Sequence, residues 1–380
     1  MRNSNLDTVD LSNFIFTADF HIKDNYNLKK VIKAVENVFE YAKANSIPTV
    51  IVAGDIFDMA RPTSKEQEVL SELLSKYLPF LHIVLMPGNH DMSNKNTYSF
   101  SYLRDLSILL PSLVIIDQYT VISQIGTNYI FIPPLLKSQK GIGQSLKSLY
   151  SDYIQGNEKP TVGKNVIISH FPICDAIIAD DYHIIGSDIL NVEILYEFFP
   201  GAMWLLGDIH KPQAITFMDS SVHYPGSPEC ISFAEKNDKK GFIHYDGIPN
   251  FVVHDTIPVH EVVLKEPVNE LFLSSDIFNT LLEEHKDFIL KLKVSVLQYD
   301  VGNWISILRG KFQNSCYMFR LEVNIIKSND TTAKIVELSD NDADILRQYL
   351  TDVIKIDGNN LQIVMDVGCS VIEEIRSRDK

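Results

Sequence analysis

The stretch that decides the fold of this 380-residue chain is TVIVAGDIFD, residues 49–58. Its first half is a short apolar run rich in β-branched residues, which predicts a buried strand. Gly54 then lets the backbone turn sharply, so the Asp55 carboxylate emerges at the carboxyl end of that strand. A carboxylate has two oxygens, and Asp55 is therefore a candidate to bridge two metal ions.

Four further polar clusters follow apolar runs in the same way: Asp19 and His21 after residues 13–17, Asn89 and His90 after 82–86, His170 after 166–168, and Asp208 with His210 after 203–206. Strand side chains alternate, so an Asp and a His one residue apart point to the same side. Each cluster alone has a plainer interpretation, such as a surface Asp, a type II turn or a buried packing histidine. Together, at one rim of a sheet, they predict a metal centre.

The first third of the chain predicts the order strand, helix, strand, helix, strand. Apolar residues recur at helical spacing between 28 and 42, and Thr63 with Glu66 indicates a capped helix that runs to about Leu78. Further strand-like runs follow at 113–116, 129–132, 166–169, 203–206 and 241–245, with fewer helices between them. This order favours an α/β fold of two packed sheets flanked by helices over a doubly wound sheet.

The pattern changes near residues 255–260. Residues 290–296 and 319–325 alternate apolar with polar side chains, which is typical of half-buried strands. Helical stretches are expected at 277–284, 301–312, 340–354 and 361–376. We therefore predict a first domain over 1–258 and a small α+β domain over 259–380 that ends in a C-terminal helix.

Composition limits the class of protein. The chain has no apolar run of eighteen residues and begins with a polar segment, so we expect neither a membrane span nor a secretory signal, and a cytoplasmic protein. Its four cysteines are far apart and form no CxxC pair, which argues against a structural zinc knot and a redox motif. The net charge of −15 is unusual for a nucleic-acid enzyme, although bound metal would neutralise several carboxylates.

The donor types indicate the chemistry. Oxygen ligands mixed with imidazole suit Mn²⁺, Fe²⁺ or Zn²⁺ better than Ca²⁺ or copper. Two neighbouring ions can bind both the attacking and the leaving oxygen of a phosphoester during in-line displacement. The residues therefore predict a two-metal phosphoesterase.

The ordered series DxH, GDxFD, GNHD, SH and GDIH resembles the calcineurin-like metallophosphoesterase superfamily. The later segments YPGSPE at 224–229, SFAE at 232–235 and KGF at 240–242 look like the SbcD branch of DNA repair nucleases. This resemblance implies one ion held by Asp19, His21, Asp55 and His210, and a second held by Asp55, Asn89, His170 and Asp208. It also implies His90 as the catalytic residue that stabilises the transition state or protonates the leaving oxygen, with Asp91 orienting it.

Two positions depart from the commoner pattern. Asp208 stands where the family usually has histidine, and an added negative ligand would bind the second ion more firmly and lower its Lewis acidity. Asp58 stands where some members have histidine, which places the chain nearer the bacterial and phage-like branch. We assign Asp58 no role in proton transfer.

The resemblance implies a DNA exonuclease and endonuclease subunit that uses two divalent ions, with Mn²⁺ as the best candidate. It further implies a homodimer that works with an SbcC-like coiled-coil ATPase in DNA repair, recombination or replication, in the host cytoplasm if the chain is viral, with residues 259–380 capping the site and positioning DNA. Basic residues near the motifs are candidate phosphate contacts: Arg61, Lys65, Lys95, Lys137, Lys140, Lys147, Lys236, Lys239 and Lys240.

Two alternatives stay open on the same scaffold. One is a phosphatase or phosphodiesterase for small substrates, and the other is a weakly catalytic scaffold of the ATPase complex. The sequence leaves open the polarity of cleavage, the preference for single or double strands, the physiological metal, the segment that docks the ATPase, and a cellular or phage origin.

Overall fold

The computed structural model describes residues 8–24, 28–94, 97–135, 146–157, 159–160, 162–179, 182–183, 189–268, 275–284, 289–297, 301–312, 316, 318–326, 334–337 and 365. The chain divides into two compact units, Met1–Thr256 and Ile257–Lys380. The expected boundary lay after residue 258. The helix expected at 340–354 lies outside the described residues, as does the one at 361–376 except for Met365. Lys95, Lys137 and Lys140 also lie outside them.

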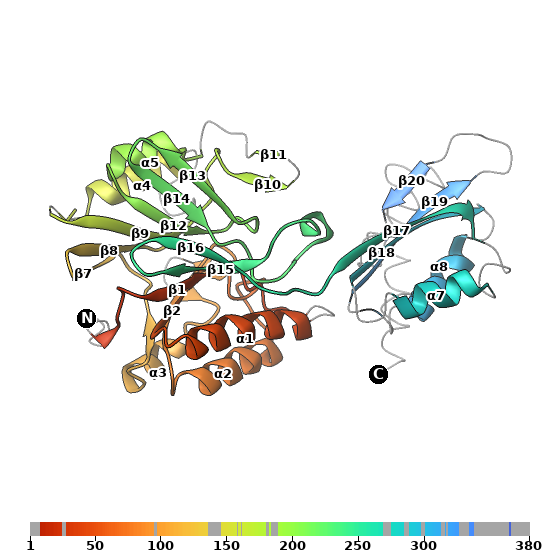
Figure 1. Cartoon of the computed structure of the whole chain (residues 1–380), viewed down its shortest axis with the longest axis horizontal. Helices are drawn as coiled ribbons and strands as arrows, with labels where there is room; N and C mark the ends of the chain where they lie inside the picture. Colours follow the sequence, from red (N-terminus) through yellow and green to blue (C-terminus); the bar gives the residue numbers. More distant parts are fainter. Residues whose placement is uncertain are drawn as a thin grey trace. The chain divides into compact units, whose positions relative to one another are not determined.

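The first unit contains a six-stranded sheet in the order β16-β15-β1-β2-β3-β6 (Figure 1). Its members are β1 (Phe14–Thr17), β2 (Thr49–Ala53), β3 (His82–Met86), β6 (Leu113–Ile115), β15 (Gly241–Tyr245) and β16 (Pro249–Val253). The neighbouring strands β1, β2, β3 and β6 run parallel, and β15 pairs with β1 in the antiparallel direction. The carboxyl ends of β1, β2 and β3 therefore lie at one edge.

A second six-stranded sheet has the order β13-β14-β12-β9-β8-β7. Its members are β7 (Thr120–Gln124), β8 (Thr127–Ile132), β9 (Lys164–His170), β12 (Met203–Gly207), β13 (Gln213–Phe217) and β14 (Ser220–Tyr224). The central strands β8, β9 and β12 are parallel, so their carboxyl ends also share one edge.

The two sheets pack face to face between two layers of helices. Along β2, Val50 and Val52 pack in the cluster under α1 (Leu28–Ala44) and α2 (Ser64–Tyr77), whereas Ile51 and Ala53 pack against the second sheet. The second sheet is covered on its other side by α4 (Leu146–Gln155) and α5 (Val192–Phe198). Burial on both faces explains why these strands are continuously apolar rather than alternating. The predicted layered α/β fold is confirmed.

Short elements complete this unit: β4 (Met92–Asn94), β5 (Thr97–Tyr98), α3 (Leu103–Leu109), β10 (Ile177–Ala179), β11 (Tyr182–His183) and the 3-10 turn η3 (Phe233–Glu235). Thr63 caps α2 as predicted, because its side chain accepts from the Glu66 amide while the Glu66 carboxylate accepts from the Thr63 amide. Among the described residues, no helix is long and apolar enough to cross a membrane.

The second unit is built on a four-stranded sheet in the order β17-β18-β19-β20. Its elements are β17 (Val259–Pro267), α7 (Asp276–Glu284), β18 (Ile289–Leu297), α8 (Val301–Phe312), β19 (Met318–Ile326) and β20 (Lys334–Glu337). Residues of α7 and α8 share one core with the apolar positions of β18 and β19, such as Leu292 and Val323. The alternate positions carry charge: Lys291 lies 2.5 Å from Glu322, and Lys293 lies 2.7 Å from Glu261. These lysines are paired with carboxylates of the same sheet.

Candidate metal centre

The carboxyl ends of strands from both sheets meet at one place, and the polar clusters extend from them. Asp19 and His21 follow β1, Asp55 follows β2, and Asp208 follows β12. These loops are tied directly, since the Asp19 amide donates to the Gly54 carbonyl at 3.0 Å and the His21 amide donates to the Asp55 carbonyl at 2.9 Å. The Asp208 amide donates to the Asp19 carboxylate at 3.1 Å. Strands of two sheets thus deliver their side chains to a single site.

The backbone at four of these side chains is in the left-handed region. The φ angles are +59° at Asp19, +47° at His21, +51° at Asp55 and +90° at Asp208. This region is uncommon outside glycine, and each such residue costs on the order of 1–3 kcal/mol. Strain of this kind concentrates where a site requires a particular side-chain direction, which is the case here.

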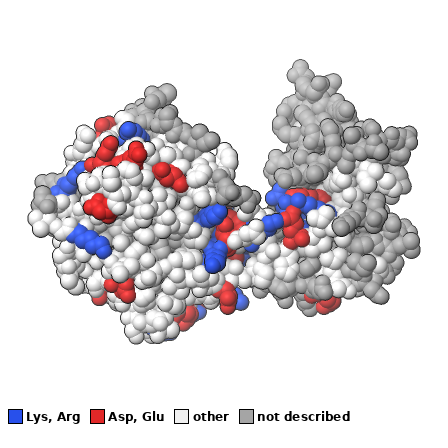
Figure 2. Space-filling view, turned by 45° about the horizontal axis from the view of Figure 1, so that its top comes forward, with Lys and Arg blue, Asp and Glu red and all other residues white. Residues whose placement is uncertain are grey.

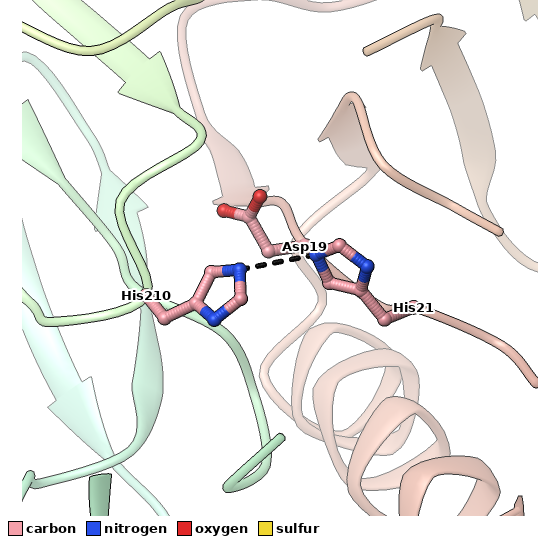
Figure 3. Close-up of side chains that lie close together, drawn as sticks. All are labelled: Asp19, His21 and His210. Carbon is pink, nitrogen blue, oxygen red and sulfur yellow. Dashed lines mark hydrogen bonds between the residues drawn. The ribbon is translucent and has the colours of Figure 1, made fainter. Parts of the chain in front are cut away.

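Asp19, His21 and His210 form a first group of donors (Figure 3). The Nε2 atoms of His21 and His210 face one another at 3.0 Å. Two nitrogens that bind one ion at about 2.1 Å and at roughly a right angle would be about 3 Å apart. The spacing and the donor types therefore fit one divalent ion.

His170, Asn89, Asp55 and Asp208 form a second group. His170 Nε2 lies 2.9 Å from Asn89 Oδ1, 3.3 Å from Asp55 Oδ2 and 3.6 Å from Asp208 Oδ1. Asp55 Oδ2 also lies 3.7 Å from His21 Nε2. One oxygen of Asp55 therefore faces both groups, as the predicted bridging position requires.

The second ring nitrogen of each histidine faces a protein oxygen. His170 Nδ1 lies 2.7 Å from the Ala53 carbonyl, and His90 Nδ1 lies 2.9 Å from the Asp58 carbonyl. His210 Nδ1 lies 3.1 Å from Glu235 Oε1. His21 Nδ1 is 3.5 Å from the Asp58 carboxylate without forming a hydrogen bond. An Nδ1–H held in this way leaves Nε2 as the ligand atom, which is the usual arrangement around bound metals.

The electrostatics of the site favour a cation. Asp19 and Asp55 are buried within reach of the Asp208 carboxylate. Burial alone would raise the pKa of Asp55, but the neighbouring His170 lowers this pKa to about 2. Burial raises the pKa of Asp208, and the nearby Asp19 and Asp55 act in the same direction. Carboxylates gathered out of water require compensation, which a divalent ion supplies.

His90 differs from the other histidines because it is exposed. Its backbone amide donates to Asp55 Oδ1 at 2.9 Å, and its ring lies edge-on to that of His21 with centroids 5.1 Å apart. A ligand atom of His90 lies within 4.8 Å of those of His21 and Asp55, so the ring is at the exposed edge of the donor groups, where it could also contact substrate.

Asp91, which we predicted to orient His90, directs its carboxylate at other groups. The Asp91 carboxylate is fully buried and accepts from the amides of Ile56, Phe57 and Gly88 and from the Ser99 hydroxyl at 2.7–3.2 Å. The His90 ring faces the Asp58 carbonyl instead. Asp91 thus joins the loop after β2 to the loop after β3. Burial raises its pKa, as does the nearby Asp55 charge, while the hydrogen bonds from Gly88, Ser99 and Phe57 act in the opposite direction.

Two residues of the site have contacts that the sequence did not predict. Glu235 contacts His210. Lys240, which we expected to contact phosphate, is 1% exposed, and its ammonium lies 2.6 Å from the Glu235 carboxylate. Lys240 is therefore a buried partner of the site and not a DNA contact. Their only sequence signal was membership of the SFAE and KGF segments. Of the other basic candidates, Lys65 is exposed and paired with Asp24 at 2.6 Å.

A cavity of about 450 Å³ is lined by residues that follow His210 in sequence and by residues of β14, β15 and β16. Lys211 and Lys239 line it together with His223 and Phe251. It combines an aromatic ring, apolar surface, cationic side chains and the Asp238 carboxylate.

Residues 12–212, more than half of the chain, match the calcineurin-like phosphoesterases, and the chain belongs to this family. It is thus a member of a family of phosphoester hydrolases, with a candidate centre for divalent metal.

Solved structures with a similar fold have low identity. A dimetal phosphatase from Danio rerio is 12% identical over 61% of this chain and 91% of its own, with a TM-score of 0.37. The phosphoesterase Yfce from E. coli is 13% identical over 62% of this chain and 88% of its own, with a TM-score of 0.30. Phosphopantetheinyl hydrolase from Mycobacterium tuberculosis is 13% identical over 57% of this chain and 90% of its own, with a TM-score of 0.34. Such distant likeness does not indicate a substrate.

Proposed function

We propose that this chain is the nuclease subunit of a DNA-processing complex, which hydrolyses phosphodiester bonds with two divalent ions. One observation carries the proposal: the segment that resembles the SbcD nucleases belongs to the metal centre. Glu235 of SFAE contacts the His210 ring, and Lys240 of KGF contacts the His210 carbonyl at 3.0 Å. Because these residues contact a predicted metal ligand, we infer that the segment affects catalysis as well as packing.

The donor groups support a particular set of ligands. Asp19, His21, Asp55 and His210 would hold one ion, and Asp55, Asn89, His170 and Asp208 the other. Bound ions would supply Lewis-acid polarisation of a phosphoryl oxygen. The second set offers three oxygen donors and one nitrogen, and this harder set supports Mn²⁺ over Zn²⁺.

His90 is the residue proposed to act on the substrate. Its Nδ1–H is engaged by the Asp58 carbonyl, so Nε2 is the ring atom left to face substrate, and it can donate a hydrogen bond or a proton to the leaving oxygen when the ring is an imidazolium. Its exposure gives a bound phosphodiester direct access to this ring. His21 and His170 are buried and have no such access.

The proposal includes a homodimer and an SbcC-like ATPase partner in the cytoplasm. Ile108 and Leu109 at the end of α3 are 70% and 75% exposed, and Tyr102, Leu106 and Leu110 nearby are exposed as well. Apolar side chains gathered in this way support contact with a second chain. With a net charge of −15, this chain would leave much of the basic DNA surface to its partner. Residues 257–380 would position the DNA.

A phosphatase or phosphodiesterase for small substrates is the second candidate. The same net charge favours it, because a small phosphoester needs no basic track. A scaffold that binds ions without cutting is the third.

The test compares three substrates with Mn²⁺: end-labelled linear duplex DNA, bis(p-nitrophenyl) phosphate and p-nitrophenyl phosphate. We expect shortening of the DNA and hydrolysis of the diester, both lost with a chelator and in Asp55→Asn. A matched control is Glu36→Gln, which removes only the surface pair with Lys76 on α2. Turnover of the monoester without DNA cutting, even with an SbcC-like ATPase and ATP, would indicate the small-substrate enzyme. Ion binding without any hydrolysis would indicate the scaffold.

A further inference from the structure

Glu235 lies at the end of η3 and points its carboxylate at a predicted metal ligand. Its Oε1 is 3.1 Å from His210 Nδ1, while His210 Nε2 faces His21 Nε2 at 3.0 Å. The carboxylate therefore contacts the side of the imidazole opposite the donor group. His210 is 25 residues away in sequence, so this contact depends on how the segment after β14 folds back.

The Glu235 carboxylate is held in place by donors on both oxygens. Oε1 also accepts from the Ser232 hydroxyl at 3.1 Å, and Oε2 accepts from the Ile231 amide at 3.1 Å. The Lys240 ammonium donates to Oε2 at 2.6 Å. Glu235 is 5% exposed, and rotating its carboxylate would break several of these bonds at once.

Lys240 links this carboxylate to the backbone of the same histidine. Its ammonium has three donors, and they contact Glu235 Oε2, the Ser227 hydroxyl at 2.8 Å and the His210 carbonyl at 3.0 Å. The Ser227 amide also donates to the His210 carbonyl at 3.2 Å. A buried ammonium is tolerated when it is paired and fully hydrogen-bonded, as it is here.

The segment also fits closely against residue 210. Gly226 has a φ of +73°, and a Cβ at this position would lie 2.6 Å from the His210 carbonyl oxygen. The main chain of His210 is therefore fixed by the loop at 226–227, and its ring is fixed by Glu235.

We propose that Glu235, held by Lys240, is the positioning residue that orients His210 and sets the tautomer in which its Nε2 binds metal. Any effect of Glu235 on hydrolysis rests on the proposed two-metal function. Its physical basis is that a carboxylate accepting Nδ1–H fixes the ring and makes the opposite nitrogen a better ligand. Loss of such a partner typically lowers metal affinity about 10–100-fold.

The other imidazole of the group has a looser arrangement. Asp58 lies 3.5 Å from His21 Nδ1 without a hydrogen bond, and its side chain is 26% exposed beside Lys23 at 2.8 Å. Removing the Asp58 charge should therefore cost less metal affinity than removing the Glu235 charge. If the two variants differ in this way, Glu235 acts by orienting the ring. If they lose equal affinity, any nearby negative charge has the same effect.

The test is Mn²⁺ binding by calorimetry to the wild-type chain and to Glu235→Gln, Asp58→Asn and Glu229→Gln. Gln has nearly the same volume as Glu but only one accepting oxygen. If the amide oxygen accepts from His210, the amide NH₂ faces the Lys240 ammonium, which is also a donor. The side chain at 235 can therefore no longer hold the His210 ring in place. Glu229 is a matched control, because it is 2% exposed in the same segment and accepts from the Cys230 amide at 2.7 Å, but contacts Lys30 rather than His210.

We expect Glu235→Gln to weaken one of two Mn²⁺ sites about 10–100-fold, with smaller effects in Asp58→Asn and Glu229→Gln. Equal affinities in Glu235→Gln and the wild type would overturn the proposal, and so would equal losses in Glu229→Gln. A second readout needs no variant: ¹⁵N shifts of the His210 ring in metal-free protein should report Nδ1–H, and an Nε2–H tautomer would overturn the assignment. Two bound ions without any DNA cutting would refute the proposed nuclease and leave the positioning role standing.

Discussion

Gly54→Ala tests whether the turn after β2 must be glycine for the metal centre to form. Gly54 has a φ of +93°, and a Cβ there would lie 2.2 Å from His170 Nδ1 and 2.8 Å from the Gly88 Cα. His170 is 1% exposed, and its Nδ1 donates to the Ala53 carbonyl at 2.7 Å. The ring cannot keep both its position and this hydrogen bond beside an added methyl group.

The magnitude has two parts. A side chain at positive φ costs roughly 1–2 kcal/mol, offset by about 0.4–1 kcal/mol from the stiffer unfolded chain. Overpacking adds about 1–3 kcal/mol, and a buried donor left without its acceptor adds a similar amount. We therefore expect Gly54→Ala to lower the free energy of unfolding by roughly 2–8 kcal/mol, with loss of the ion that His170 is proposed to hold.

Gly247→Ala is the matched control, because its φ is +104° and a Cβ there meets nothing within 4 Å. It shares the backbone cost and lacks the clash, so we expect a loss of about 1 kcal/mol or less. Urea unfolding of metal-free protein measures the free energies, and elemental analysis measures the bound metal. Equal losses of stability in the two variants, or unchanged metal content in Gly54→Ala, would refute this account of the turn.

Three further variants test other parts of the site. Asp91→Asn should lower the free energy of unfolding by about 2–4 kcal/mol in urea titrations, because an NH₂ group replaces an acceptor of buried amides; wild-type stability would contradict this. His90→Ala should slow diester hydrolysis by about 10²–10⁴-fold with metal content unchanged, whereas loss of metal would make His90 a ligand. Burial raises the pKa of Cys230 from 9.0 to about 11, so stability is complete below pH 9 and falls by up to about 3 kcal/mol as the pH rises to 11. Unfolding measured against pH should lose this slope in Cys230→Ser, and an unchanged slope would contradict the buried thiol.

The fold could be predicted because its signals are local. Apolar runs at Thr49–Ala53 and 203–207 mark strands, and the polar residues that follow each run lie at strand ends whatever the order of the sheets. The capping box at Thr63 likewise lies within four residues. Five clusters of the same type then identify a site without knowledge of the tertiary structure.

The rest depends on contacts between distant residues. Asp91 follows His90 in sequence, yet its carboxylate turns away to buried amides of the neighbouring loop. Lys240 looks like a surface lysine in sequence but is buried against Glu235 and the His210 carbonyl. No periodic pattern in the sequence predicts the contacts of these two side chains, because the contacts depend on which loops pack beside the strand ends.

The central claim is that one side chain, Asp55, joins two ion sites, and native mass spectrometry in Mn²⁺ tests it most directly. Asp55 Oδ2 faces His21 on one side and His170 on the other, at 3.7 Å and 3.3 Å. We predict two ions per wild-type chain and at most one in Asp55→Asn. A single ion in the wild type, or two ions retained in Asp55→Asn, would contradict the account.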